Sequence, residues 1–128
     1  MNRRILVLIA VVAGGTAAKC PPEQTEQGTD EENIARLERE ARSIAKTEGC
    51  GSADQCRAVP VGDRACGGPR DYIVYCARTT DSAALYRKLD ELKKAEMAFN
   101  KKSGAMSTCE FRLPPGVEVS AGQCKAIP

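Results

Sequence analysis

Apolar residues recur at helical spacing in two segments of the chain. The first segment begins at Thr29, which forms a T-x-x-E capping box with Glu32, and ends at Gly49. The second begins at Asp81, a typical N-cap residue, and runs to about Lys102. The apolar stripes consist of Ile34, Leu37, Ala41, Ile44 and Ala45 in the first segment, and of Leu85, Leu89, Leu92, Ala95 and Phe99 in the second. Each segment is predicted to be an amphipathic helix that covers an apolar surface.

Shorter segments have the pattern of β-strands. Residues 56–62 alternate weakly between apolar and polar positions, and Pro60 in this run favours an edge strand. Residues 72–77 (YIVYCA) form the most β-prone run in the chain and are predicted to be the central strand. A last strand is expected over 117–127, with a bend at Gly122. Together, these elements predict an α+β fold in which two helices pack on a small antiparallel sheet of about three strands.

The N-terminal residues have the layout of an export signal. A basic start, an apolar run and a small-residue stretch predict a signal peptide over residues 1–18, and the apolar run is shorter than the roughly 20 residues that span a bilayer. Residues 19–28 are predicted to be a flexible tether and residues 29–128 one domain. This layout predicts a periplasmic or secreted protein. Lipidation of Cys20 would anchor the chain to a membrane, but Lys19 disfavours it because the residue before a lipidated cysteine is normally small.

Composition and charge exclude several classes of function. The chain of 128 residues contains no histidine, which excludes His-based nucleophile pairs, imidazole general bases and zinc sites that need a histidine ligand. Without Arg3 and Arg4 of the predicted signal peptide, the Lys+Arg count falls from 19 to 17 and equals the 17 acidic residues. A neutral mature chain has no basic excess of the kind that nucleic-acid binding requires. We therefore expect a monomer with no cofactor and no nucleic-acid partner.

Seven cysteines are the strongest signal in the sequence. In an exported chain with few aromatic residues and a modest core, they predict a disulfide framework. The spacing contains no C-x-x-C pair, so neither a metal site nor a thioredoxin-type redox motif is expected. Structural disulfides are expected of Cys50, Cys56, Cys66, Cys109 and Cys124, and either Cys20 or Cys76 is expected to be unpaired. Bridges from Cys50 or Cys56 to Cys109, and from Cys66 or Cys109 to Cys124, are compatible with the sequence, which leaves the connectivity open.

A signature in the second half of the chain resembles that of a known group. The residues that carry it are Cys66-Gly67-Gly68-Pro69, Tyr72, Tyr75, Asn100, Ser107-Thr108-Cys109 and Gly122-Gln123-Cys124. The pattern C-G-G-P-x-x-Y-x-x-Y followed by S-x-C resembles an uncharacterised family of small exported bacterial proteins, many of them lipoproteins. Members often have a serine at the position of Cys76 and a cysteine near Val119, and this chain departs from both. The resemblance implies export and a common fold, and it implies no activity.

The loop between the two middle strands is the best place for a partner contact. Residues 62–70 (GDRACGGPR) combine arginines, which are frequent at binding hot spots, with turn-forming residues and an anchoring cysteine. A stiff loop of this kind loses little entropy on association. The candidate contact residues are Arg64, Gly67, Gly68, Pro69 and Arg70. The sequence therefore predicts a non-catalytic binding module, such as a hydrolase inhibitor, with an unidentified protein partner in the cell envelope or outside the cell.

Two other classes of function remain open. A structural or tethered protein of the cell envelope would have no discrete site. An enzyme would have to use a thiolate or a pair of carboxylates, and Asp54, Asp63 and Asp71 flank the predicted hairpin where they could converge. Acidic residues beside turns are more often turn formers and caps. No catalytic residue is therefore assigned.

Overall fold

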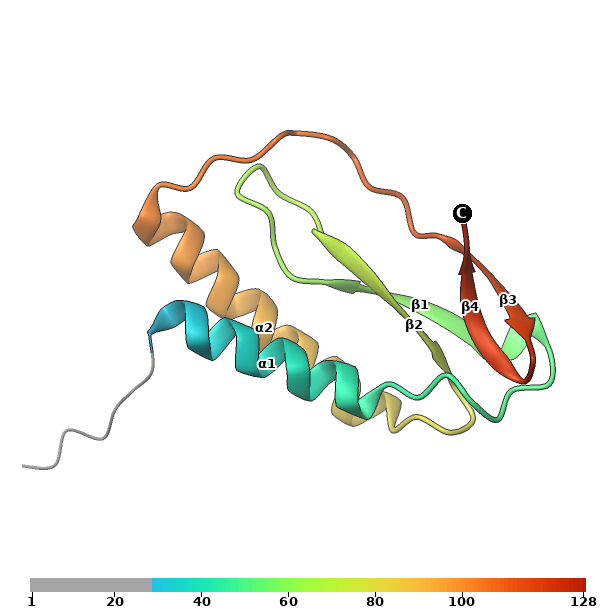
Figure 1. Ribbon diagram of the computed structural model, residues 1–128. Helices are drawn as coiled ribbons and strands as arrows, with labels where there is room; N and C mark the ends of the chain where they lie inside the picture. Colours follow the sequence, from blue (N-terminus) through green and yellow to red (C-terminus); the bar gives the residue numbers. More distant parts are fainter. Residues whose placement is uncertain (1–28) are drawn as a thin grey trace, which may run out of the picture.

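The computed structural model describes residues 29–128 (Figure 1). The predicted signal peptide, the predicted tether and Cys20 lie outside the described residues. The elements, in chain order, are α1 (Asp30–Ile44), the short 3-10 helix η1 (Ala53–Gln55), β1 (Cys56–Val61), β2 (Asp71–Cys76), α2 (Ser82–Ser103), β3 (Gly116–Ser120) and β4 (Gln123–Ile127). The predicted α+β class is confirmed, and so is its stabilisation by disulfides, of which the described residues contain three.

Helices α1 and α2 lie side by side and run in opposite directions (Figure 1). The capping box at the start of α1 is present, with Glu32 N donating to Thr29 Oγ1 at 3.2 Å and Thr29 N donating to Glu32 Oε2 at 2.8 Å. At the start of α2, Asp81 accepts a hydrogen bond from the backbone N–H of Ala84 at 3.0 Å. Helix α2 ends where Gly104 adopts a left-handed φ of 64°. Local capping signals therefore set both helix starts and the end of α2.

Helix α1 ends at Ile44, earlier than the predicted end at Gly49. The segment that follows pairs with both sheets instead of continuing the helix. The carbonyl of Lys46 accepts from Cys76 N at 2.7 Å, and the carbonyl of Thr47 accepts from Cys124 N at 2.8 Å. A longer helix would turn these carbonyls along its own axis. Tertiary hydrogen bonds therefore end α1.

The prediction of a single sheet of about three strands is wrong. Strand β1 pairs with β2, with Cys56 opposite Cys76, and β3 pairs with β4 in a separate two-stranded sheet. Strand β2 therefore has a neighbour on one side only and is not a central strand. The strand expected over 117–127 is a whole hairpin, because Ala121 and Gly122 both have positive φ (51° and 73°), as in a type I′ turn.

The β1–β2 hairpin separates two clusters of buried side chains. The larger cluster, on the helix side, consists of Leu37, Ala41, Val59, Val61, Ile73, Tyr75, Leu85, Leu89 and Leu92. The smaller, which we call the cysteine cluster, consists of Cys50, Cys56, Cys76 and Cys124, with Val74, Val117 and Val119 packed against it. Side chains alternate along a strand, so Ile73 and Tyr75 join the helix side whereas Val74 and Cys76 join the cysteine cluster. Strand β2 is thus covered on both faces over its C-terminal half, which ends at Cys76.

The disulfides differ from the pairings that the sequence left open. Cys50 is bonded to Cys76, Cys56 to Cys124 and Cys66 to Cys109. The expectation that Cys76 could be unpaired is therefore wrong: its side chain faces the cysteine cluster, with its Cα 5.7 Å from that of Cys50. Among the described residues, none of the bridges from Cys50 or Cys56 to Cys109, or from Cys66 or Cys109 to Cys124, is formed. The reason is that Cys56 begins β1 and Cys66 follows its end, which places Cys66 and Cys109 at the opposite end of the hairpin from the cluster.

Candidate functional site

Residues 105–115, which we call the strap, connect α2 to β3 and cross the loop of the β1–β2 hairpin (Figure 1). Three contacts tie the strap to this loop and to β2. They are the Cys66–Cys109 disulfide, a hydrogen bond from Cys66 N to Ser107 Oγ at 3.0 Å, and one from the Tyr72 hydroxyl to Arg112 O at 3.0 Å. The strap has no regular secondary structure of its own, so these side-chain contacts fix its path.

Arg64 adds the densest set of contacts to the strap. Its guanidinium donates to the carbonyl of Glu110 at 2.5 Å, to the hydroxyl of Thr108 at 2.6 Å and to the carbonyl of Thr108. A planar guanidinium holds several acceptors in a fixed arrangement, which a lysine cannot do. Arg64, one of the predicted contact residues, therefore holds the strap in place from the side of the hairpin loop.

The strap is exposed along almost its whole length. Every residue from 105 to 114 is exposed, and Met106, Phe111 and Leu113 expose 96%, 87% and 72% of their surface. Single exposed apolar residues are common, but three within eight positions of an anchored segment are typical of a contact surface. From its sequence, this segment is predicted only to be a loop that connects the second helix to the last strand. A signal for its exposure is the set of large apolar residues next to Pro114-Pro115, in a stretch with neither helical nor alternating periodicity.

The backbone of the strap has two different edges around Phe111. The carbonyls of Thr108, Glu110 and Arg112, two residues apart, all accept hydrogen bonds from the hairpin side. A period of two is that of an extended chain, in which alternate residues direct their backbone groups to opposite sides. Cys109, Phe111 and Leu113 accordingly direct theirs away from the hairpin, and within residues 29–128 their N–H groups make no hydrogen bond. The outer edge of the strap thus carries backbone N–H groups that have no partner among the described residues, as the edge of a strand does.

The other predicted contact arginine, Arg70, faces the helices. Its Nε donates to Glu96 Oε1 at 2.7 Å, and its Nη2 to Glu38 Oε2 at 2.5 Å. The hydrogen bond from Arg70 lowers the pKa of Glu38 below its ordinary value, against the opposing effect of partial burial. The backbone N–H of Asp63 donates to Glu96 Oε2 at 2.5 Å, and Asn100 Nδ2 donates to Asp63 O at 2.9 Å. These contacts fix loop 62–70 to both helices, and the loop in turn supports the strap.

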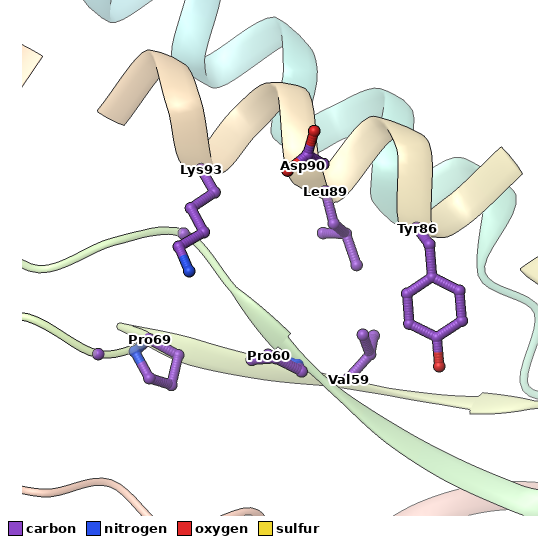
Figure 2. Close-up of a pocket in the computed structure, with 9 residues that line it drawn as sticks. Val59, Pro60, Pro69, Tyr86, Leu89, Asp90 and Lys93 are labelled. Atoms are coloured by element: carbon purple, nitrogen blue, oxygen red, sulfur yellow. The ribbon is translucent and has the colours of Figure 1, made fainter. Parts of the chain in front are cut away.

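The remaining predicted contact residues lie at and near the tip of the hairpin loop. Gly67 and Gly68 have positive φ (95° and 79°), and the space beside each is open. Pro69 and Gly68 line a shallow apolar hollow between α2 and β1, together with Pro60, Tyr86 and Leu89 (Figure 2). Its volume of about 270 Å³ is below the roughly 300–1,000 Å³ of ordinary small-molecule sites. A second hollow of about 360 Å³, between α1 and α2, is lined by the Arg70, Glu38 and Glu96 side chains of the ion pairs.

Three sulfur atoms lie as close together as the ligands of a metal site, but they cannot bind a metal ion. The Sγ atoms of Cys50, Cys76 and Cys124 lie within 4.8 Å of one another and are buried. All three cysteines are in disulfides, and a disulfide sulfur offers no thiolate to a metal ion. The described residues bring these atoms together as a packed pair of disulfides.

The acidic residues considered as catalytic candidates do not form one group. Asp54 precedes β1 and Asp63 follows its end, so the six-residue strand separates them by about 20 Å. Asp71 forms an ion pair with Arg42 at 2.9 Å on the exposed side of α1. The three carboxylates therefore do not flank a common cleft.

No family model, curated protein or solved structure matches the chain, so comparison with known proteins assigns it to no family. In residues 29–128, neither helix is long and apolar enough to cross a membrane.

Proposed function

We propose that the protein is an exported, non-catalytic binding module and that the strap is its contact surface. The observation that supports this most directly is that the strap is both anchored and exposed. It is tied to the hairpin by the side chains of Ser107 and Cys109 and by the carbonyls of Thr108, Glu110 and Arg112, while its apolar side chains are open to solvent. A free loop of this composition would collapse onto the protein or lose considerable entropy on binding.

The partner we propose is a protein of the cell envelope or of the surroundings of the cell. Association would bury Phe111 and Leu113, and large apolar side chains near the centre of an interface supply most of its free energy. The unpaired outer edge of the strap adds backbone hydrogen bonds, as in recognition by strand addition. Loop 62–70, in this proposal, acts through the strap because Arg64 and Arg70 are engaged within the chain.

The compartment in the proposal is the periplasm or the outside of the cell. Three disulfides are consistent with an oxidising compartment, because cytosolic reductants keep thiols reduced. The predicted signal peptide over residues 1–18 supports the same compartment. A disulfide-stiffened module can also keep its binding surface exposed in the absence of a partner.

The test compares three immobilised, oxidised proteins for what they retain from an envelope extract and from culture fluid. The strap variant is Phe111→Ala/Leu113→Ala. The matched control is Met97→Ala/Ile127→Ala, because both residues are about half exposed and lie outside the strap. We expect the wild type and the control to retain the same proteins and the strap variant to lose them at least about tenfold. Retention that is equal for all three, with equal thermal stability, would show that the strap is not the contact surface.

A further inference from the structure

The strap is anchored along one edge and open along the other, which is what an endopeptidase cleft requires of a peptide that it binds. An extended peptide pairs with a protein through main-chain hydrogen bonds along one edge and through pockets for alternate side chains. The outer edge of the strap presents the backbone groups of Cys109 and Phe111, two residues apart, which is the spacing that a short antiparallel ladder requires. The inner edge is occupied by Arg64 and by the Tyr72 hydroxyl. A cleft could therefore pair with the outer edge without displacing any contact of the strap.

We propose that the strap is a substrate-like inhibitory loop for a serine endopeptidase that cleaves after aromatic side chains. Phe111 enters the primary specificity pocket, and the Phe111–Arg112 peptide bond lies at the nucleophilic serine. This inference rests on the proposed function, since it requires the strap to be the contact surface. Phe111 is 87% exposed on the anchored segment, and a hydrophobic slot that takes an aromatic side chain is an established form of such a pocket.

The anchors on each side of this bond explain inhibition rather than digestion. In the first step, the serine Oγ gives its proton to the enzyme's general base and attacks the carbonyl carbon of Phe111. The bond to Arg112 N then breaks, and the protonated base gives the proton to the new amine. In an ordinary substrate this amine leaves and water takes its place. Here the carbonyl of Glu110 is held by Arg64 and that of Arg112 by Tyr72, so the amine stays beside the ester.

The amine then attacks the ester and gives one proton to the base, the peptide bond re-forms, and the base returns this proton to the departing serine Oγ. This religation is intramolecular and therefore outcompetes attack by water. Cleavage would also release no fragment, because the Cys56–Cys124 disulfide and the β3–β4 hairpin hold the residues after Arg112 to the rest of the chain.

The class of nucleophile follows from the compartment and from the mechanism. Religation requires an acyl-enzyme, which metal-dependent and aspartic endopeptidases, acting through an activated water, do not form. A catalytic thiolate can form one, but it is readily oxidised in the oxidising compartments with which the disulfides are consistent. A serine nucleophile meets both conditions.

The first experiment measures inhibition of two probe enzymes, chymotrypsin and subtilisin, by the oxidised wild-type protein. We expect slow, tight inhibition, and we expect Phe111→Ala to raise the inhibition constant about 100-fold or more. Met106→Ala is the matched control, since Met106 is exposed on the same strap but lies before its anchored part; its inhibition constant should stay within about threefold of the wild type. Phe111→Lys should transfer inhibition from chymotrypsin to trypsin, because the residue in the pocket sets the preference.

The second experiment tests the anchors. Arg64→Ala and the double variant Cys66→Ser/Cys109→Ser should turn the inhibitor into a substrate, with cleavage between Phe111 and Arg112 at least about tenfold faster than in the wild type. The cleavage site is read by mass spectrometry after reduction, because the Cys56–Cys124 disulfide otherwise holds the two pieces together. Both variants keep the two disulfides of the cysteine cluster, and circular dichroism before digestion verifies the fold.

Two results separate this inference from the proposed function. If neither chymotrypsin nor subtilisin is inhibited, or if the wild type is cut at Phe111 as fast as the anchor variants, the inhibitory loop is refuted. Strap-dependent retention of envelope proteins would in that case still support the proposed function. If retention does not depend on the strap, the proposed function fails as well, and the two measurements identify which has failed.

Discussion

One buried carboxylate, that of Glu96, joins the hairpin loop to α2. Its side chain is 8% exposed, and it accepts hydrogen bonds from Asp63 N and from Arg70 Nε. A buried charge is tolerated only when it is paired and hydrogen-bonded in this way. Gly62 lies directly against the pair, with a φ of 72°; a Cβ there would overlap Glu96 Oε2 and come within 2.8 Å of Arg70 Nε. Both the positive φ and the lack of room for a Cβ require a glycine at this position.

We therefore expect Gly62→Ala to lower the free energy of unfolding by about 3 kcal/mol, because it strains the backbone and also separates a buried ion pair. Gly67→Ala is the control: its φ is also positive, at 95°, but nothing lies within 4 Å of the added Cβ. Only the backbone strain remains there, at about 1 kcal/mol. Urea unfolding of the oxidised proteins measures both, and equal losses would contradict the role given to the Glu96–Arg70 pair.

Residue types in loop 62–70 could be interpreted from the sequence, but their directions could not. Arg64 and Arg70 were expected to project toward a partner, and turn-rich loops with arginines often do. Their acceptors are the carbonyls of Thr108 and Glu110 and the carboxylates of Glu38 and Glu96, which lie 26 to 46 residues away in the chain. No local pattern marks such partners. The role of these arginines depends on the packing of the helices and of the strap.

At the scale of elements, Glu38 connects α1 to the base of the hairpin loop. Its carboxylate accepts from Arg42 on the same helix at 2.9 Å and from Arg70 at 2.5 Å. The hydrogen bond from Arg70 is the main cause that lowers the pKa of Glu38 below its ordinary value of 4.5. A carboxyl group whose pKa is lower in the folded state stabilises the fold only while it is ionised.

This arrangement predicts a loss of stability in acid. The contribution of Glu38 should be fully present above pH 4.5 and should disappear as the pH falls through its lower folded-state pKa. We expect the free energy of unfolding to fall as the pH is lowered from about 5, and Glu38→Gln to make this fall shallower. Glu31→Gln on the same helix is the control and should follow the wild type, because Glu31 has no ion-pair partner within residues 29–128. Urea unfolding at several pH values gives both curves; parallel curves for wild type and Glu38→Gln would count against this linkage.

The elements differ in how far the sequence determines them. Helix α2 agrees with its prediction because its apolar period, its Asp81 cap and its terminal Gly104 are all local signals. The β3–β4 hairpin was predicted as one strand because Ala121 takes a positive φ, which alanine rarely does and which no sequence rule assigns to it. The strap was predicted only as a loop. Its extended path depends on Cys66 and Arg64, about 45 residues earlier, so its exposed edge could not be inferred from residues 105–115 alone.

At the scale of the whole molecule, two disulfides each hold a different segment to the rest of the chain. Cys56–Cys124 fastens the β3–β4 hairpin to β1, and Cys66–Cys109 fastens the strap to the hairpin loop. The helix-side cluster contains no residue of β3 or β4, so its packing does not depend on them. The two bridges close loops of 68 and 43 residues, and loop-closure entropy assigns each about 4 kcal/mol. The total free energy of unfolding therefore cannot distinguish the roles of the two disulfides. The part of the molecule that loses structure when each disulfide is removed can distinguish them.

We expect Cys56→Ala/Cys124→Ala to remove hydrogen-exchange protection from β3 and β4 while α1, α2 and the β1–β2 hairpin keep theirs, because only the cysteine cluster is opened. Cys66→Ala/Cys109→Ala should have the opposite effect: β3 and β4 stay protected, and the strap becomes sensitive to proteolysis at Phe111. Both variants should be less stable to urea by about 4 kcal/mol. Exchange measured by mass spectrometry on the oxidised proteins separates the two patterns. Loss of protection in the helices of the first variant would show instead that one cooperative core spans both sheets.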